Sequence, residues 1–208
     1  MLLAVGCAAS SAGGAGSIRT VAPVERAAGQ LDRSWTNEQL GVAARSLQRA
    51  FARDGAEALL RLRLNAAEVG QLFVEDARRR MGRMPQGLGP TPGEGRWQMY
   101  RALGRGPTLG FCARGVRVAD EHGADGVRGR ALWVDRLLIV GGDGEGIWAA
   151  WIEGLILTDS GWRLVPVVPY ERQVAAPRRD HTDVQLWDCD FAQRPPTAGT
   201  GPPPRATE

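Results

Sequence analysis

Charged residues interrupt two strongly apolar segments in the second half of the chain. Asp135 and Arg136 stand within LWVDRLLIV, and Glu153 stands within WAAWIEGLIL. Charges in such segments either form an ion pair on a half-exposed sheet face or line a polar pocket. If the two segments form a hairpin that turns at residues 143–144, Arg136 lies opposite Trp151 and diagonal to Glu153, close enough to pair.

This register predicts a ligand-binding cluster of Asp135, Arg136, Trp151 and Glu153. In a pocket wall, Arg136 and Glu153 could act as an acid–base pair or recognise a carboxylate, and the indole could stack on the guanidinium. The alternative is a structural ion pair, and it is favoured because charge pairs of this kind are structural as often as catalytic.

Other candidates for catalysis or metal binding are scarce. His122 lies in the turn-like EHGADG, and His181 lies in RRDHTDVQLWDCD. The second segment also holds metal-ligand residue types, namely Asp180, Asp183, Asp188, Cys189 and Asp190, but their spacing matches no familiar metal site. The two tyrosines, Tyr100 and Tyr170, stand in no catalytic motif, and no G-x-S-x-G, Walker or H-E-x-x-H motif occurs. The sequence therefore predicts no catalytic set, no metal and no cofactor.

The basic residues do not indicate nucleic-acid binding. All 26 are arginines, they are interspersed with 23 acidic residues, and the net charge is only +3. A nucleic-acid binder is expected to cluster its basic residues beside aromatic platforms. The densest run, Arg78-Arg79-Arg80 with Arg83, is expected on the solvated face of a helix.

The start of the chain, MLLAVGC, resembles the lipobox of bacterial lipoproteins. The resemblance implies cleavage after Gly6 and lipidation of Cys7. Ala4 departs from the usual leucine, and residues 1–6 are a truncated signal-peptide remnant, which a start codon further upstream would explain. Residues 8–30 are mostly small and polar, as a membrane tether should be. We therefore expect a lipid-anchored, periplasm-facing envelope protein. The alternative is a cytoplasmic protein with an unmodified Cys7.

If Cys7 carries lipid, two cysteines remain. Cys112 and Cys189 could form a disulfide in an oxidising compartment and tie the late QLWDCDF segment to the domain. Two unrelated buried thiols remain the alternative.

The elements that must position these residues change in character along the chain. A helix is expected from Thr36 as N-cap with Gln39 completing a capping box, and Asp54-Gly55 ends it. A short second helix (AEALLRLRL) and a third one follow. The third is capped by Asn65 with Glu68 three residues on, and its apolar stripe consists of Val69, Leu72, Phe73, Ala77 and Met84. RWQMYRAL (96–103) fits either helical turns or a short strand. Four strand-like runs then follow, namely TLGFCARGVRVAD, VRGRALWVDRLLIVGG, GIWAAWIEGLILT and GWRLVPVVPYE, joined by hairpin-type turns.

This order predicts an α+β fold in which N-terminal helices pack on a curved antiparallel meander. The expected division is a signal remnant (1–6), a flexible tether (7–33), the domain (34–172) and a Pro/Arg/Asp-rich tail (173–208), disordered from about 194. On the second strand, alternation places Leu132, Val134, Leu138 and Val140 on one face and Trp133, Leu137 and Ile139 on the other. Both faces therefore need cover, one from the helices and one from a partner subunit, the tail or a bent part of the sheet.

The helix–break–helix stretch LQRAFARDGAEALLRLR (47–63) and the hairpin LILTDSGWRLVPV resemble the nuclear transport factor two-like superfamily, the cone fold of ketosteroid isomerases and polyketide cyclases. The chain departs from that pattern in two places. The strand that this superfamily has between its second and third helices is poorly defined here, and residues 84–95 form a long Gly-Pro loop. A cystatin-like or unrelated helix-plus-meander fold therefore stays open. The lipobox-like start, the tether and the lack of a catalytic set together predict a domain that binds a ligand or partner without catalysis. The outer sheet face could take a second copy of the chain or another envelope protein. The alternatives are a small isomerase- or cyclase-type enzyme and a cytosolic dimerisation module.

Overall fold

The computed structural model describes residues 17–23, 25, 30–55, 57–82, 94–142, 146–166, 178–179 and 189–193. Its helices are α1 (Arg33–Asp54), α2 (Glu57–Leu62), α3 (Ala66–Leu72), α4 (Glu75–Gly82) and α5 (Glu94–Arg105). Its strands are β1 (Thr108–Asp120), β2 (Arg130–Gly142), β3 (Ile147–Thr158), β4 (Gly161–Leu164), β5 (Arg178–Arg179) and β6 (Phe191–Gln193). The predicted α+β fold is confirmed. No helix in these ranges is long and apolar enough to cross a membrane.

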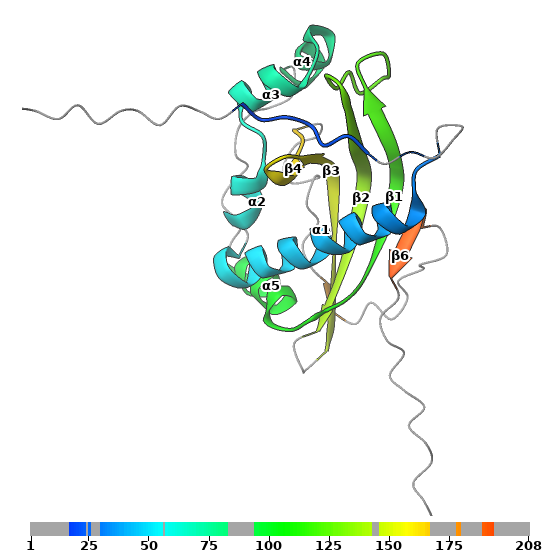
Figure 1. Ribbon diagram of the computed structural model, residues 1–208. Helices are drawn as coiled ribbons and strands as arrows, with labels where there is room; N and C mark the ends of the chain where they lie inside the picture. Colours follow the sequence, from blue (N-terminus) through cyan, green and yellow to red (C-terminus); the bar gives the residue numbers. More distant parts are fainter. Residues whose placement is uncertain are drawn as a thin grey trace, which may run out of the picture.

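The sheet is an antiparallel meander with the order β4-β3-β2-β1-β6, and β5 pairs with β3 (Figure 1). The four predicted strand-like runs therefore contain strands in the predicted order, the fourth over Gly161–Leu164. The meander's helix-covered face carries α1, which runs across the long strands, and α5 lies beside the end of α1 (Figure 1). Cys7, Met84, Tyr170, His181 and the predicted turn at 143–144 lie outside the described residues.

Helix α1 begins one turn earlier than predicted. The N-cap is Asp32, whose carboxylate accepts the Trp35 N–H at 2.9 Å. Thr36 is instead fully buried inside the helix, so the predicted capping box with Gln39 is wrong. A carboxylate at this position satisfies an otherwise unpaired N–H group and interacts favourably with the helix dipole. The predicted end is confirmed, since Gly55 adopts a φ of 57° directly after Asp54.

The predicted third helix is two helices. Asn65 and Glu68 form the expected capping box, with each side chain accepting the other residue's backbone N–H. The helix ends at Leu72 because Phe73 is extended and bridges to Val127 of the β1–β2 connection. Tertiary pairing thus interrupts a sequence whose apolar spacing favours one continuous helix.

The main core lies between the helices and the sheet. Leu40, Leu47 and Phe51 of α1, Leu59 of α2 and Leu103 of α5 are all at most 1% exposed. They pack against strand residues that point towards the helices, namely Phe111, Ala113, Leu132, Val134, Leu137, Ile139, Ile152 and Leu155. This core excludes water from long strands that are apolar on both faces.

The predicted division of β2 into two faces is wrong beyond Val134. Leu132 and Val134 face the helices and thus share one face, as predicted. Leu137 and Ile139, which were predicted on the opposite face, also face the helices. The alternation shifts by one residue at Asp135-Arg136, which are both exposed. Leu138 and Val140 consequently face away from the helices, on the same side as Trp133.

The face of the sheet turned away from α1, here called the outer face, is covered at both ends by the chain itself. At one end Trp133 packs with Phe73, Ala77 and Ile18, which come from the α3–α4 segment and the N-terminal segment. At the other end Leu138 and Val140 pack with Cys112, and Cys189 lies against them. A partner subunit, the tail or a bent part of the sheet was expected to cover this face. At one end the cover comes from the tail, through Cys189.

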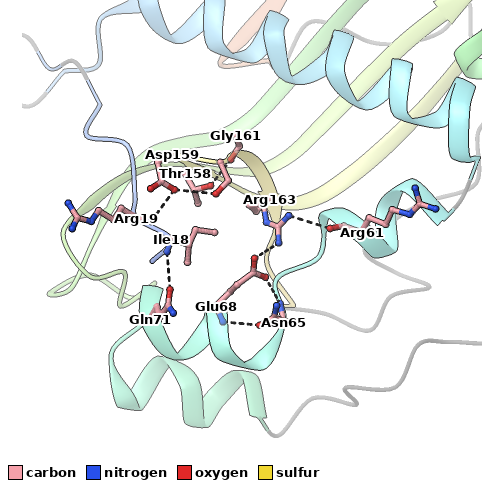
Figure 2. Close-up of polar contacts among 11 residues, drawn as sticks. Ile18, Arg19, Arg61, Asn65, Glu68, Gln71, Thr158, Asp159, Gly161 and Arg163 are labelled. Carbon is pink, nitrogen blue, oxygen red and sulfur yellow. Dashed lines mark hydrogen bonds and ion pairs between the residues drawn. The ribbon is translucent and has the colours of Figure 1, made fainter. Parts of the chain in front are cut away.

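A polar network joins the N-terminal segment, α3 and the β3–β4 hairpin (Figure 2). Arg163 of β4 forms an ion pair with Glu68 and donates to the Arg61 carbonyl at 3.3 Å. The Ile18 N–H donates to Gln71 at 3.0 Å, and the Arg19 N–H donates to Asp159 at 3.1 Å. These contacts fix residues 17–20 beside the hairpin, so the ordered domain begins before the predicted boundary at residue 34.

Candidate functional site

The predicted cluster lies on the outer face, not between the helices and the sheet. The side chains of Asp135 and Arg136 are 50% and 57% exposed, and Glu153 is 23% exposed. Arg136 Nε donates to a Glu153 carboxylate oxygen at 2.8 Å. The predicted pair therefore forms, but in the half-exposed setting of the structural alternative.

The predicted hairpin register is wrong by two residues. Arg136 lies directly opposite Glu153, and Trp151 lies opposite Leu138. The same register continues to Gly142 opposite Ile147. The Trp151 indole is stacked by Arg114 of β1, whose guanidinium carbon lies 5.3 Å from the ring centroid. The expected stacking of Arg136 on Trp151 is replaced by this contact.

Sequence reasoning missed the most strongly bound cation of the outer face, Arg117. Two hydrogen bonds join it to Asp125 at 2.8 and 2.9 Å, and it lies 2.7 Å from Asp135. Hydrogen bonding to Asp125 and then to Asp135 holds the pKa of Arg117 above its usual range, against the opposing effect of burial. Asp135 also accepts the Trp133 Nε1–H at 2.9 Å. Its carboxylate is thus committed to structural partners.

Two glycines allow the shift of faces at Asp135. Gly115 and Gly154 are the neighbours of Asp135 on β1 and β3, and both have positive φ, 64° and 69°. A Cβ on Gly115 would lie 2.1 Å from a carboxylate oxygen of Asp135. Only glycine leaves room for this side chain with that backbone. The charged side chains of the outer face therefore stabilise the shift of faces at Asp135-Arg136. They are Arg114, Arg117, Arg136, Asp125, Asp135 and Glu153.

The two late cysteines meet at the edge of the sheet. Cys112 and Cys189 form a disulfide with a Cα–Cα distance of 5.5 Å. Directly after it, Phe191, Ala192 and Gln193 pair with β1 as strand β6. The Asp190 carboxylate accepts the Val116 N–H at 3.0 Å, and its carbonyl accepts from Arg33 at 3.0 Å. We call residues 189–193 the clamp segment.

An open groove begins where the clamp segment leaves β1. It has a volume of about 520 Å³ and is lined by Gln30, Leu31, Arg33, Val116, Arg117, Val118 and Phe191. A second hollow of about 300 Å³ shares Arg33 and Phe191 and continues along the start of α1. The Arg33 guanidinium stacks 4.8 Å above the Phe191 ring between them. We call the two together the β1-edge groove.

The β1-edge groove runs beside a strand edge. Within the described part of the chain, no strand pairs with β1 on this side beyond Ala113. The Val116 N–H faces this edge, because Asp190 accepts it, and the backbone of Val118 faces it as well since alternate residues share a direction. An unpaired edge of this kind is a template for an added strand.

The described residues hold no group of three or more histidine, cysteine or acidic side chains suited to a metal ion. His122 lies in the exposed turn after β1, where its ring is 3.7 Å from the neighbouring Glu121. Comparison of the chain with protein-family models, curated proteins and solved structures finds no match. The resemblances to the lipobox and to the cone fold therefore stay predictions.

Proposed function

We propose that this chain is a lipid-anchored protein of the bacterial cell envelope whose cone-like domain binds an extended segment of a partner protein and catalyses nothing. The observation that carries the proposal is the disulfide-held clamp segment, which ends beside an open strand edge and its groove. Fixed edges of this kind recognise peptides by adding a strand.

The cysteines support the location. A disulfide persists in oxidising compartments such as the periplasm and is rare in the cytosol. The Cys112–Cys189 bond uses two of the three cysteines and leaves Cys7, the residue that stands in the lipobox-like stretch. An acyl chain on Cys7 would keep the domain at a membrane surface.

The β1-edge groove supports the binding mode. Val116 and Val118 point their side chains towards the helix layer, and Leu31 and Phe191 complete an apolar wall. An added strand would pair with the backbone of Val118 and place alternate apolar side chains against that wall. The sequence of the bound segment is therefore expected to alternate apolar and polar residues.

The location is tested by intact mass and fractionation in a bacterial host, using a gene extended to the next upstream in-frame start. We expect the protein in the membrane fraction with the mass of an acylated chain beginning at Cys7. A Cys7→Ser variant should lose the acyl mass, because serine has no thiol to accept the lipid. A soluble wild-type chain with an unmodified Cys7 would contradict the anchor.

The binding mode is tested by photo-crosslinking in cells from Gln30, an exposed residue of the groove. We expect an adduct from Gln30 but not from Ser160, which is exposed on the β3–β4 turn. Val118→Pro should reduce the adduct about tenfold, because proline removes one edge-facing donor and its ring obstructs an added strand. Val118→Thr, which keeps the N–H, should retain it. Equal adducts from both sites would contradict the groove, and an adduct of twice the chain mass would assign it to a homodimer.

A further inference from the structure

A second surface carries unbalanced positive charge. Arg45 and Arg49 lie one turn apart on α1, and Arg101 and Arg105 lie one turn apart on α5. All four side chains are exposed. Within the part of the chain that the structure describes, none of them forms an ion pair, in contrast to Arg53, Arg61, Arg79, Arg117, Arg136 and Arg163. We call these four residues the basic helix surface.

The packing of the two helices brings the four arginines together. Gly104 lies so close to α1 that a Cβ there would be 2.3 Å from the Ala52 backbone nitrogen. Gln48 of α1 donates to the Leu103 carbonyl at 2.7 Å. The arginines flank these contacts on both helices, and α5 lies beside the end of α1 (Figure 1). The positive charges thus lie on two helices packed against each other in the helix layer, on the side of the molecule opposite the outer face.

Repulsion among these arginines lowers the stability of the domain when no anion is bound. Like charges four residues apart on a helix repel each other, and both helices carry such a pair here. The acidic residues of α1 do not neutralise them, because Glu38 lies two turns before Arg45 and Asp54 lies 2.8 Å from Arg53 and 3.2 Å from Arg61. The field of the basic helix surface is therefore available to an external anion.

We propose that the basic helix surface docks on the anionic phospholipid headgroups of a bilayer. Guanidinium groups bind phosphate oxygens in a bidentate manner, which suits a layer of phosphodiesters. The exposed Val42 favours lipid over nucleic acid. It is 38% exposed, lies one turn before Arg45 and can enter the interface between headgroups and acyl chains. The choice of a bilayer rests on the proposed membrane anchor, which would keep the domain close to such a surface.

The test uses the full chain with Cys7→Ser, so that no acyl chain contributes, and measures co-sedimentation with lipid vesicles. We expect binding to vesicles of 30% phosphatidylglycerol in phosphatidylcholine and none to phosphatidylcholine alone. One arginine near an anionic surface strengthens binding about fivefold. The R45Q/R49Q/R101Q/R105Q variant should therefore bind on the order of 100-fold more weakly or worse. The matched R19Q/R79Q/R80Q/R130Q variant also loses four exposed charges, all outside the basic helix surface, but should bind within a few-fold of the parent. Circular dichroism establishes that both variants are folded.

Equal losses in the two variants would overturn the proposal, since they would show a dependence on net charge alone. Binding to neutral vesicles, or no binding to anionic ones, would also overturn it. Tighter binding to a 20-base-pair DNA duplex than to the anionic vesicles at the same salt would assign the surface to nucleic acid instead. If the wild-type chain proves not to be acylated while the unacylated chain still binds anionic vesicles, the anchor fails and the basic helix surface stands.

Discussion

Replacing Cys112 and Cys189 together by serine is expected to lower the free energy of unfolding by about 4 kcal/mol. The cross-link closes a loop across 77 residues, and a loop of that length restricts the unfolded chain strongly. The midpoint of thermal unfolding should fall by on the order of 10 °C for a domain of this size. Thermal unfolding followed by circular dichroism measures the change, with Cys7→Ser as a control that removes a thiol outside the bond.

The effect of this double variant should be greatest at the sheet edge. Without the bond, the clamp segment is held by three strand pairs, by Asp190 on Val116 and by the Phe191–Arg33 contact. Hydrogen exchange should therefore accelerate at Phe111 and Ala113, which pair with β6, more than at Leu137 and Ile139 in the sheet centre. An unchanged midpoint, or equal acceleration in both places, would contradict a role of the disulfide in holding β6 on β1.

Local patterns were enough to predict most of the elements. The Asn65–Glu68 capping box, the stop at Gly55 and the four strand-like runs each depend on residues close in sequence, and each is confirmed. The α1 start was missed because two residues one turn apart, Asp32 and Thr36, are both good N-caps. Propensity alone does not choose between them, whereas burial of Thr36 does.

The candidate site was predicted only in part, because its geometry depends on contacts across strands. Asp135, Arg136 and Glu153 are indeed neighbours, yet strict alternation placed them in the wrong register and the β2 residues on the wrong faces. The shift depends on Gly115 and Gly154, which lie on other strands. One signal was available, since a glycine stands within each of the two apolar runs beside LWVDRLLIV. The partners of Arg117 and the β1-edge groove had no such signal in the sequence.

Replacing Gly104 by alanine is expected to lower the free energy of unfolding by about 3 kcal/mol, although alanine favours helix. The added Cβ would lie 2.3 Å from the backbone nitrogen and 2.5 Å from the Cα of Ala52, and a backbone cannot turn aside as a side chain can. The α1–α5 contact would have to open. The Gln48–Leu103 hydrogen bond and the Phe51–Tyr100 ring contact, with centroids 5.4 Å apart, lie next to it and would be disturbed.

Gly70→Ala in α3 is the matched control. Its Cβ would meet only an Arg78 nitrogen at 4.0 Å, so the substitution should stabilise the protein by up to about 1 kcal/mol through helix propensity alone. Urea unfolding measures both variants. Opposite signs for the same substitution in two helices would show that close packing, not propensity, sets the α1–α5 contact. Stabilisation by Gly104→Ala would mean that the helices lie further apart, and the four arginines of the basic helix surface would then no longer form one surface.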